Sequence, residues 1–277
     1  MSNFIPPIPN FRTDKNISQL FGMNRDFYYS RFGIPAHNGW DLYSTGPRND
    51  YGTPVYAAHD WKKESVQYNF PGSTTGNRIY LRTLDGFHTS AYLHLSKFNP
   101  TFLNVNSGKA GDVIAYRGNT GLVSPKPTAS NPYGGTHTHF GVRDNRQLNN
   151  EYKGYVDPTP FLYTSENRLP FWLDRDLFMG VWGASDEISY LQTLLKLEIP
   201  VLTFQPIGIF GNQTRKAVNE VQQLHCLSTY GTGIAGPKTR KVLNTRYSAP
   251  EKLGSIEPHD AAGFNDLIFS DPSLYED

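Results

Sequence analysis

The chain has 277 residues, a length that favours two domains over one. Its 26 Lys and Arg residues almost balance its 25 Asp and Glu residues, and the lack of a dense basic patch argues against a protein that binds nucleic acid. The single cysteine, Cys226, excludes an intrachain disulfide framework and a zinc site built from thiolates.

The beginning of the chain, MSNFIPPIPNFRTDKN, lacks a basic segment followed by an apolar run, and its three prolines oppose a helix. No apolar stretch elsewhere reaches the length that a membrane-spanning helix needs. We therefore expect neither a signal peptide nor a membrane span.

Residues 18–163 are expected to form a β-rich domain. Short runs of β-branched and aromatic residues, such as NRIYLRTL and GDVIAYRG, are bounded by Gly, Pro, Asn and Asp. Long helical periodicity is absent from this part of the chain. The pattern breaks at residues 164–183, which read as a connector whose Phe171, Trp172, Phe178 and Trp182 are expected to pack on another element.

The pattern changes to a helical period after the connector. Three segments place apolar residues on one helical face, and we predict helices over 185–199, 212–227 and 236–247. The stretches GIFGNQTRKAV and GIAGPKTRKVL repeat each other, which is typical of a compact helical module. Residues 248–277 are acidic and contain prolines, so we expect a flexible or loosely docked tail.

The stretch GGTHTHFGV places His137 and His139 one residue apart in a predicted strand. A period of two puts both imidazoles on the same face of a sheet. A polar outer face is the simplest explanation of such a pair, so the other histidines and the carboxylates must decide. His59, His88, His225 and His259 fit turn, structural or exposed positions.

A second stretch, AHNGWDLYS, contains His37 and Asp41. On a straight strand their Cα atoms would lie about 13 Å apart, too far to hold one ion comfortably. The Asn38-Gly39 step permits a bend that brings them together. Two imidazoles and one carboxylate around an open position are a typical ligand set of catalytic zinc.

The chemistry of such a site also needs a group that moves protons. The chain has no H-E-x-x-H motif to supply a glutamate base. His94, in the alternating run SAYLHLSKF, is the obvious candidate. Whichever of His137 and His139 does not bind the metal is the other candidate.

Three stretches resemble, in order and spacing, the lysostaphin-type zinc endopeptidases, which cut the peptide cross-links or stems of bacterial peptidoglycan: AHNGWDLYSTGPRNDYGTPVYAAHD, TSAYLHLSKFNPTFLNVNSGKAGDVIAYRGNTG and GGTHTHFGV. The resemblance covers residues 18–163. It implies a mainly β, antiparallel-sheet peptidase domain whose sheet forms the floor of a narrow groove. It also implies Zn²⁺ bound by His37, Asp41 and His139, with His94 and His137 as catalytic residues.

The chain departs from the family pattern in three places. The segment LYSTGPRND is longer than usual, the loop LVSPKPTASNPYGG precedes the histidine pair, and Thr138 replaces an apolar residue. None of these replaces a ligand, so we expect them to alter specificity and not chemistry. A tyrosine before the first ligand assists some members; Tyr28 and Tyr29 lie nearby, and neither is assigned a role.

Residues 184–247 resemble the three-helix peptidoglycan-binding module often appended to wall hydrolases. A helical packing domain without a ligand is the alternative. The expected organisation is a zinc peptidase domain over 1–163, a linker over 164–183, a smaller three-helix domain over 184–247 and an acidic tail over 248–277.

The sequence thus predicts a monomeric zinc endopeptidase that hydrolyses peptide bonds of peptidoglycan in the cell wall or extracellular space. The alternatives are a zinc amidase that cuts between sugar and stem peptide, and a catalytically silent wall-binding protein. A phage-type lysin, or release by lysis, would account for a wall enzyme without a signal peptide, as would another export route.

Overall fold

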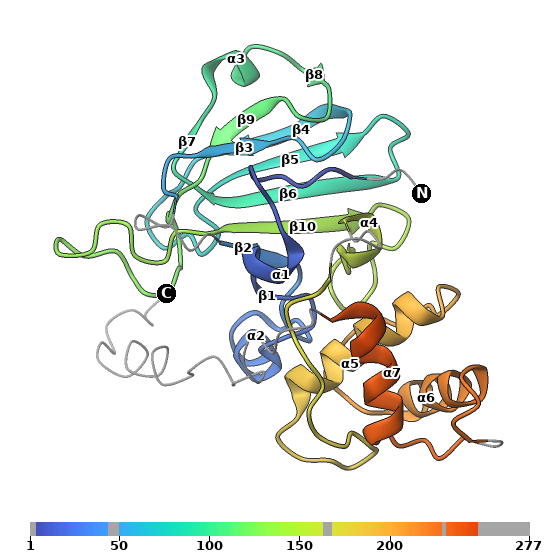
Figure 1. Ribbon diagram of the computed structural model, residues 1–277. Coiled ribbons are helices and arrows are strands. Elements are labelled where there is room, and N and C mark those ends of the chain that lie inside the picture. The colour runs from blue at the N-terminus through green and yellow to red at the C-terminus, as the bar shows by residue number, and fades with distance from the viewer. Residues whose placement is uncertain (1–3, 44–49, 163–167, 229–230, 249–277) are drawn as a thin grey trace.

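The computed structural model describes residues 4–43, 50–162, 168–228 and 231–248 (Figure 1). Its main element is an eight-stranded antiparallel sheet in the order β1-β2-β10-β6-β5-β4-β8, with β11 paired to β10. The strands are β1 (Ile17–Gln19), β2 (Trp40–Leu42), β4 (Trp61–Gln67), β5 (Asn77–Thr83), β6 (His88–Leu95), β8 (Ser107–Gly108), β10 (Thr138–Asp144) and β11 (Tyr155–Val156). The prediction of a mainly antiparallel β domain is confirmed.

A smaller three-stranded sheet has the order β3-β9-β7 and shares its core with the large sheet. Its strands are β3 (Pro54–Tyr56), β7 (Lys97–Phe98) and β9 (Val113–Tyr116). Among the short helices, α2 (Arg25–Phe32) and α3 (Pro100–Leu103) connect strands, whereas α1 (Thr13–Asn16) precedes β1 and α4 (Thr159–Leu162) follows β11. The shared core buries Val55 and Ala115 of the small sheet with Leu81, Tyr92 and Phe140 of the large one.

Strand β10 shows how one strand serves both the core and the opposite face. Phe140 and Val142 belong to the hydrophobic core. The residues that alternate with them, His139, Gly141 and Arg143, therefore face away from that core. The polar residues His139 and Arg143 of β10 therefore lie on the outer face of the large sheet.

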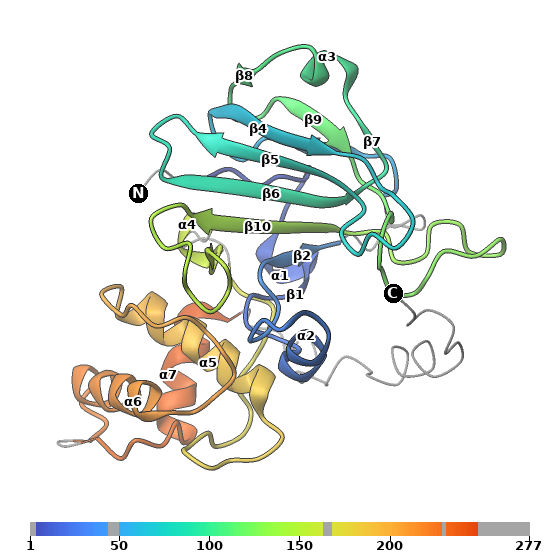
Figure 2. The same ribbon diagram turned by 180° about the vertical axis from the view of Figure 1, so that it is seen from behind.

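The C-terminal part of the chain is helical, with α5 (Ser185–Glu198), α6 (Asn212–Leu224) and α7 (Pro237–Tyr247) lying below the large sheet in both views (Figure 1 and Figure 2). The three helices occur where the periodicity predicted them. Their apolar faces are buried as predicted, with Ile188 and Leu191 on α5, Val218 and Val221 on α6, and Leu243 on α7. Whether they form a separate domain stays a prediction.

The helices are docked directly on the sheet domain. The Ser189 hydroxyl of α5 donates to the carbonyl oxygen of Gly22, and Asp186 accepts a hydrogen bond from the backbone N–H of Asn24 at 2.8 Å. Gly22 has a φ of +85°, and a Cβ there would lie 2.6 Å from the carbonyl oxygen of Pro206. Only glycine therefore permits both the backbone angle and the close approach of the two parts.

The predicted connector is packed through its leucines more than through its aromatic residues. Leu169, Leu173 and Leu177 are buried, whereas Trp182 is 91% exposed. Phe171 is half-buried against the core, so the expected aromatic packing holds for Phe171 and is wrong for Phe178 and Trp182, which are exposed.

The predicted acidic tail lies, from residue 249 onward, outside the described residues. Among the described residues, no helix has both the length and the apolar character needed to cross a membrane.

Candidate metal centre and catalytic site

Three side chains converge on the outer face of the large sheet: His37 and Asp41, four residues apart, and the distant His139, which together we call the metal cluster. Asp41 on β2 lies directly opposite His139 on β10 in the strand register, so strand pairing itself brings them together. Asp41 Oδ1 lies 3.1 Å from His37 Nε2 and 3.0 Å from His139 Nδ1. The two imidazole nitrogens are themselves 3.0 Å apart.

The close approach of these residues requires Gly39. A Cβ at this position would lie 2.6 Å from both His139 Nε2 and the carbonyl oxygen of Phe140. The sequence predicts that the Asn38-Gly39 step matters because glycine allows the backbone to bend between His37 and Asp41. The structure shows instead that the lack of a side chain is decisive, because the backbone of Gly39 does not adopt a left-handed φ.

The orientation of His37 is fixed by the loop that precedes α2. Its Nδ1 lies 3.0 Å from the carbonyl oxygen of Leu20, which can only accept, so Nδ1 carries the proton. The backbone N–H of His37 donates to Met23 O, and its carbonyl accepts from Gly22 N, both at 2.8 Å. This arrangement directs Nε2 to the cluster, as outer hydrogen bonds do for metal-binding histidines.

The donor set of the cluster fits a divalent cation such as Zn²⁺. Ligands placed tetrahedrally about 2.1 Å from zinc lie about 3.4 Å from one another, close to the separations observed here. Burial favours the neutral carboxyl of Asp41, but the surrounding histidines outweigh this effect and hold its pKa well below the usual value. Burial also lowers the pKa of His139, which favours the neutral form that binds metals.

His94 and His137 lie beside the metal cluster, with their ring centres 4.5 Å apart. His94 Nδ1 is 2.9 Å from the carbonyl oxygen of Thr120, and His137 Nδ1 is 2.8 Å from that of Gly135. In each ring, Nε2 is therefore the nitrogen left for chemistry. His137 Nε2 lies 3.8 Å from Asp41 Oδ1.

His94 reaches the site through an irregular backbone. Strand alternation would place its neighbour Leu93, which pairs with His139, on the outer face. His94 has a φ of +61°, and the register of β6 against β5 shifts between Asn77 and Ile79. Such a left-handed residue at a bulge redirects a side chain and is held there by its surroundings. Burial, followed by the nearby His137, lowers the pKa of His94 to about 3.

The structure thus brings together all five residues singled out in the sequence, and it adds one that was left unassigned. Tyr28 on α2 packs its ring 5.2 Å from that of His37. Burial and then the charge of Asp41 raise the pKa of Tyr28 well above its usual value, so the phenol stays protonated. Tyr29 is 62% exposed. Because Tyr28 and Tyr29 are adjacent in the sequence, their positions alone do not show which of them lies at the site.

Two segments of the chain match known families. Residues 35–151 match peptidase family M23, and residues 186–243 match a putative peptidoglycan binding domain. The first match contains the metal cluster together with His94 and His137. The second match covers the three C-terminal helices almost entirely.

The chain is also similar to individual proteins. It is 38% identical over 155 residues to the glycyl-glycine endopeptidase ALE-1 of Staphylococcus capitis, a match that covers 54% of this chain and 37% of that protein. It is 35% identical over 130 residues to lysostaphin of Staphylococcus simulans, covering 46% of this chain and 21% of lysostaphin. The chain therefore matches less than half the length of these curated relatives.

A solved structure of the antimicrobial peptidase lysostaphin from Staphylococcus simulans aligns with a TM-score of 0.38 and 27% identity. The alignment covers 54% of this chain and 50% of that chain.

Proposed function

We propose that this chain, which combines a peptidase family M23 domain with a putative peptidoglycan binding domain, is a zinc endopeptidase that hydrolyses peptide bonds of bacterial peptidoglycan. The observation that carries the proposal is the convergence of His37, Asp41 and His139 inside the segment that matches the peptidase family. We assign these three residues as the metal ligands. The name of the Staphylococcus capitis relative, a glycyl-glycine endopeptidase, favours a bond between glycines as the one that is cut.

Zn²⁺ at such a ligand set polarises an amide carbonyl and lowers the pKa of water. His94 and His137 are assigned to proton transfer. One accepts the proton of the attacking water, and the other stabilises the oxyanion or protonates the leaving nitrogen. Their Nε2 atoms suit this work because backbone carbonyls already engage Nδ1 of each ring.

The remaining parts of the proposal concern the organisation of the protein. The peptidase domain spans 1–163, and a three-helix wall-binding domain spans 184–247 after a linker over 164–183. Binding to an insoluble polymer would raise the local concentration of the enzyme at its substrate. The protein acts as a monomer in the cell wall or extracellular space, delivered by a phage or released by lysis.

The test is digestion of purified cell walls with glycine cross-bridges and of walls with direct cross-links, each with and without a chelator. Mass spectrometry should find new amino termini within peptides, lost on chelation and restored by Zn²⁺. Free glycan strands with intact stem peptides would instead identify an amidase. Binding without any cleavage, at full zinc occupancy, would identify a silent wall-binding protein.

A further inference from the structure

A polar cavity of about 300 Å³ lies on the large sheet, lined by residues of β4, β5, β10 and β11. The residues that matter for its chemistry are Glu64, Gln67, Arg78, Tyr80, Arg143 and Tyr155. Its size is in the range of pockets that hold a small ligand or part of a larger one. None of these residues belongs to the metal cluster or to the pair of catalytic histidines.

The cavity opens on the same face of the sheet as the metal cluster. His139 and Arg143 both lie on β10, four residues apart, so their side chains share a face and their Cα atoms are about 14 Å apart. Tyr155 on β11 pairs directly with Arg143. Tyr80 of β5 is paired with Ala91 of β6, and Ala91 is paired with Gly141 of β10. Tyr80 therefore lies on the same face as His139 and Arg143.

Arg143 forms no ion pair among the described residues of the cavity. Its guanidinium lies 5.9 Å from the centre of the Tyr155 ring, and its Nε atom is buried without a hydrogen-bond partner among the described residues. A buried donor without an acceptor is unfavourable unless water or a ligand supplies one. No carboxylate of the described residues lies within ion-pair distance of Arg143 or Arg78.

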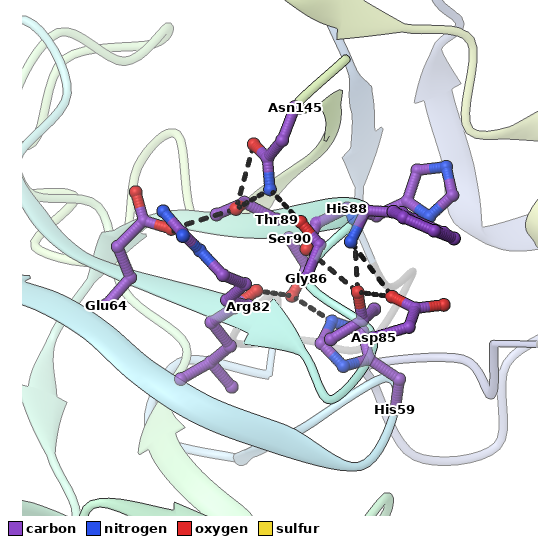
Figure 3. A network of polar contacts seen from close by, with 12 residues as sticks. His59, Glu64, Arg82, Asp85, Gly86, His88, Thr89, Ser90 and Asn145 are labelled. Carbon is purple, nitrogen blue, oxygen red and sulfur yellow. Dashed lines mark hydrogen bonds and ion pairs between the residues drawn. The ribbon is translucent and has the colours of Figure 1, made fainter.

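The second arginine, Arg78, makes only neutral contacts. Its guanidinium donates to the side chains of Gln67 and Thr75. The one acidic residue in the cavity, Glu64, is already engaged, since its Oε2 accepts from Arg82 Nε at 3.1 Å and from the Thr89 hydroxyl at 2.9 Å (Figure 3). The cavity therefore keeps an excess of positive charge.

Two tyrosines complete the lining with neutral donors. Burial, and then the neighbouring Tyr80, raises the pKa of Tyr155, so its phenol stays protonated. The Tyr155 ring lies over Gly141, where a Cβ would come within 2.7 Å of Cε1. Guanidinium and phenol groups that converge in this way are suited to a carboxylate, which arginine can bind through two parallel hydrogen bonds.

We infer that this cavity binds a free carboxylate of the peptide being cut, so that the enzyme selects an acidic peptide segment over a neutral one. The inference rests on the proposed function for the identity of the peptide. It assigns Arg143 and Arg78 to substrate specificity and not to bond cleavage. A run of glycines alone offers no carboxylate, so the acidic group must come from the segment that adjoins it.

The test uses two synthetic peptides with a run of glycines, identical except that one ends in a free carboxylate and the other in a carboxamide. The carboxylate is placed about four residues from the bond to be cut, which matches the distance along β10. For the wild-type holoenzyme we expect a KM at least tenfold lower for the acid than for the amide. In Arg143→Gln this difference should disappear, with kcat retained.

The matched control is Arg146→Gln, because Arg146 is already paired with Asp144 through Nε at 2.8 Å and lies outside the cavity. It should keep the preference for the acid, and circular dichroism should show all variants folded. Equal KM values for acid and amide in the wild type, or an unchanged preference in Arg143→Gln, would overturn the inference.

Calorimetric binding of the same two peptides separates this inference from the proposed function. A difference in binding without any hydrolysis would refute the peptidase proposal and leave the carboxylate site standing. Equal affinity for both peptides would refute the carboxylate site, whether or not the peptides are hydrolysed.

Discussion

Two buried polar clusters that contain histidine lie on opposite faces of β6, and only one of them has the properties of a ligand site. In the second cluster, which we call the His59 network, His59 Nε2 lies 2.8 Å from the Ser90 hydroxyl (Figure 3). The Nδ1 atom of His59 lies 2.7 Å from the carbonyl oxygen of Asp60. The Tyr92 hydroxyl accepts from Ser90 and from the backbone N–H of Ala58. Both ring nitrogens of His59 therefore have a protein partner.

The metal cluster differs in which atoms face one another. His37 Nε2, His139 Nδ1 and Asp41 Oδ1 meet at 3.0–3.1 Å, and the proton of His37 is already committed to Leu20. His37 Nε2 and Asp41 Oδ1 are two acceptors in contact, so a cation or the ring proton of His139 must lie between them. The comparison teaches that unmatched acceptors, and not the number of histidines, distinguish a metal site from a structural network.

The largest expected effect is the loss of metal in His139→Ala. Removing one of three protein ligands should lower zinc affinity by more than about 100-fold and abolish wall lysis, and zinc content per chain measures this directly. His59→Ala is the matched control. It should keep stoichiometric zinc but lose about 1–3 kcal/mol of unfolding free energy, because Ser90 loses a buried partner. Full zinc in purified His139→Ala would refute the ligand assignment.

A smaller effect is expected from His94→Ala, which tests the residues next to the cluster. The variant should retain zinc, since His94 is not among the three converging ligands. Wall lysis should fall by about 10²–10⁴-fold, the usual contribution of a group that transfers protons. A variant that lyses walls at the wild-type rate would exclude His94 from catalysis.

The smallest expected effect concerns pH and the His59 network. Burial lowers the pKa of His59, although the Asp60 carbonyl opposes the shift. Below the ordinary histidine value of about 6.5, the unfolded chain takes up more protons than the folded one, so stability falls as the pH falls. Urea unfolding at pH 7.5 and 5.5, with chelator present, should show a smaller loss in His59→Gln than in the wild type. An identical loss in both proteins would mean that His59 does not contribute.

The sequence could predict the metal cluster from a strand pattern together with a family resemblance. The strand period predicts that His137 and His139 share one face. His37 and Asp41 are weak evidence as a pair, and their assignment as ligands comes from the resemblance to the lysostaphin-type family. The antiparallel domain and the three helices likewise follow from residue patterns.

The groups that position the site could not be predicted in the same way. The carbonyls of Leu20, Thr120 and Gly135 orient the histidines, and backbone atoms carry no signature in the sequence. The left-handed φ of His94 depends on the register between two strands. Strand alternation taken alone would have directed His94 to the wrong face.

The contact between α5 and the loop before α2 has a consequence for how such proteins can be recombined. Gly22 accepts from Ser189 on α5 and donates to the carbonyl of His37, so a single residue links the helical region to a metal ligand. The helices are thus not an interchangeable anchor that can be cut off or replaced at the connector. A chimaera with a foreign C-terminal module must rebuild the contact with Gly22, or the metal cluster will lose one of the contacts that hold His37 in place.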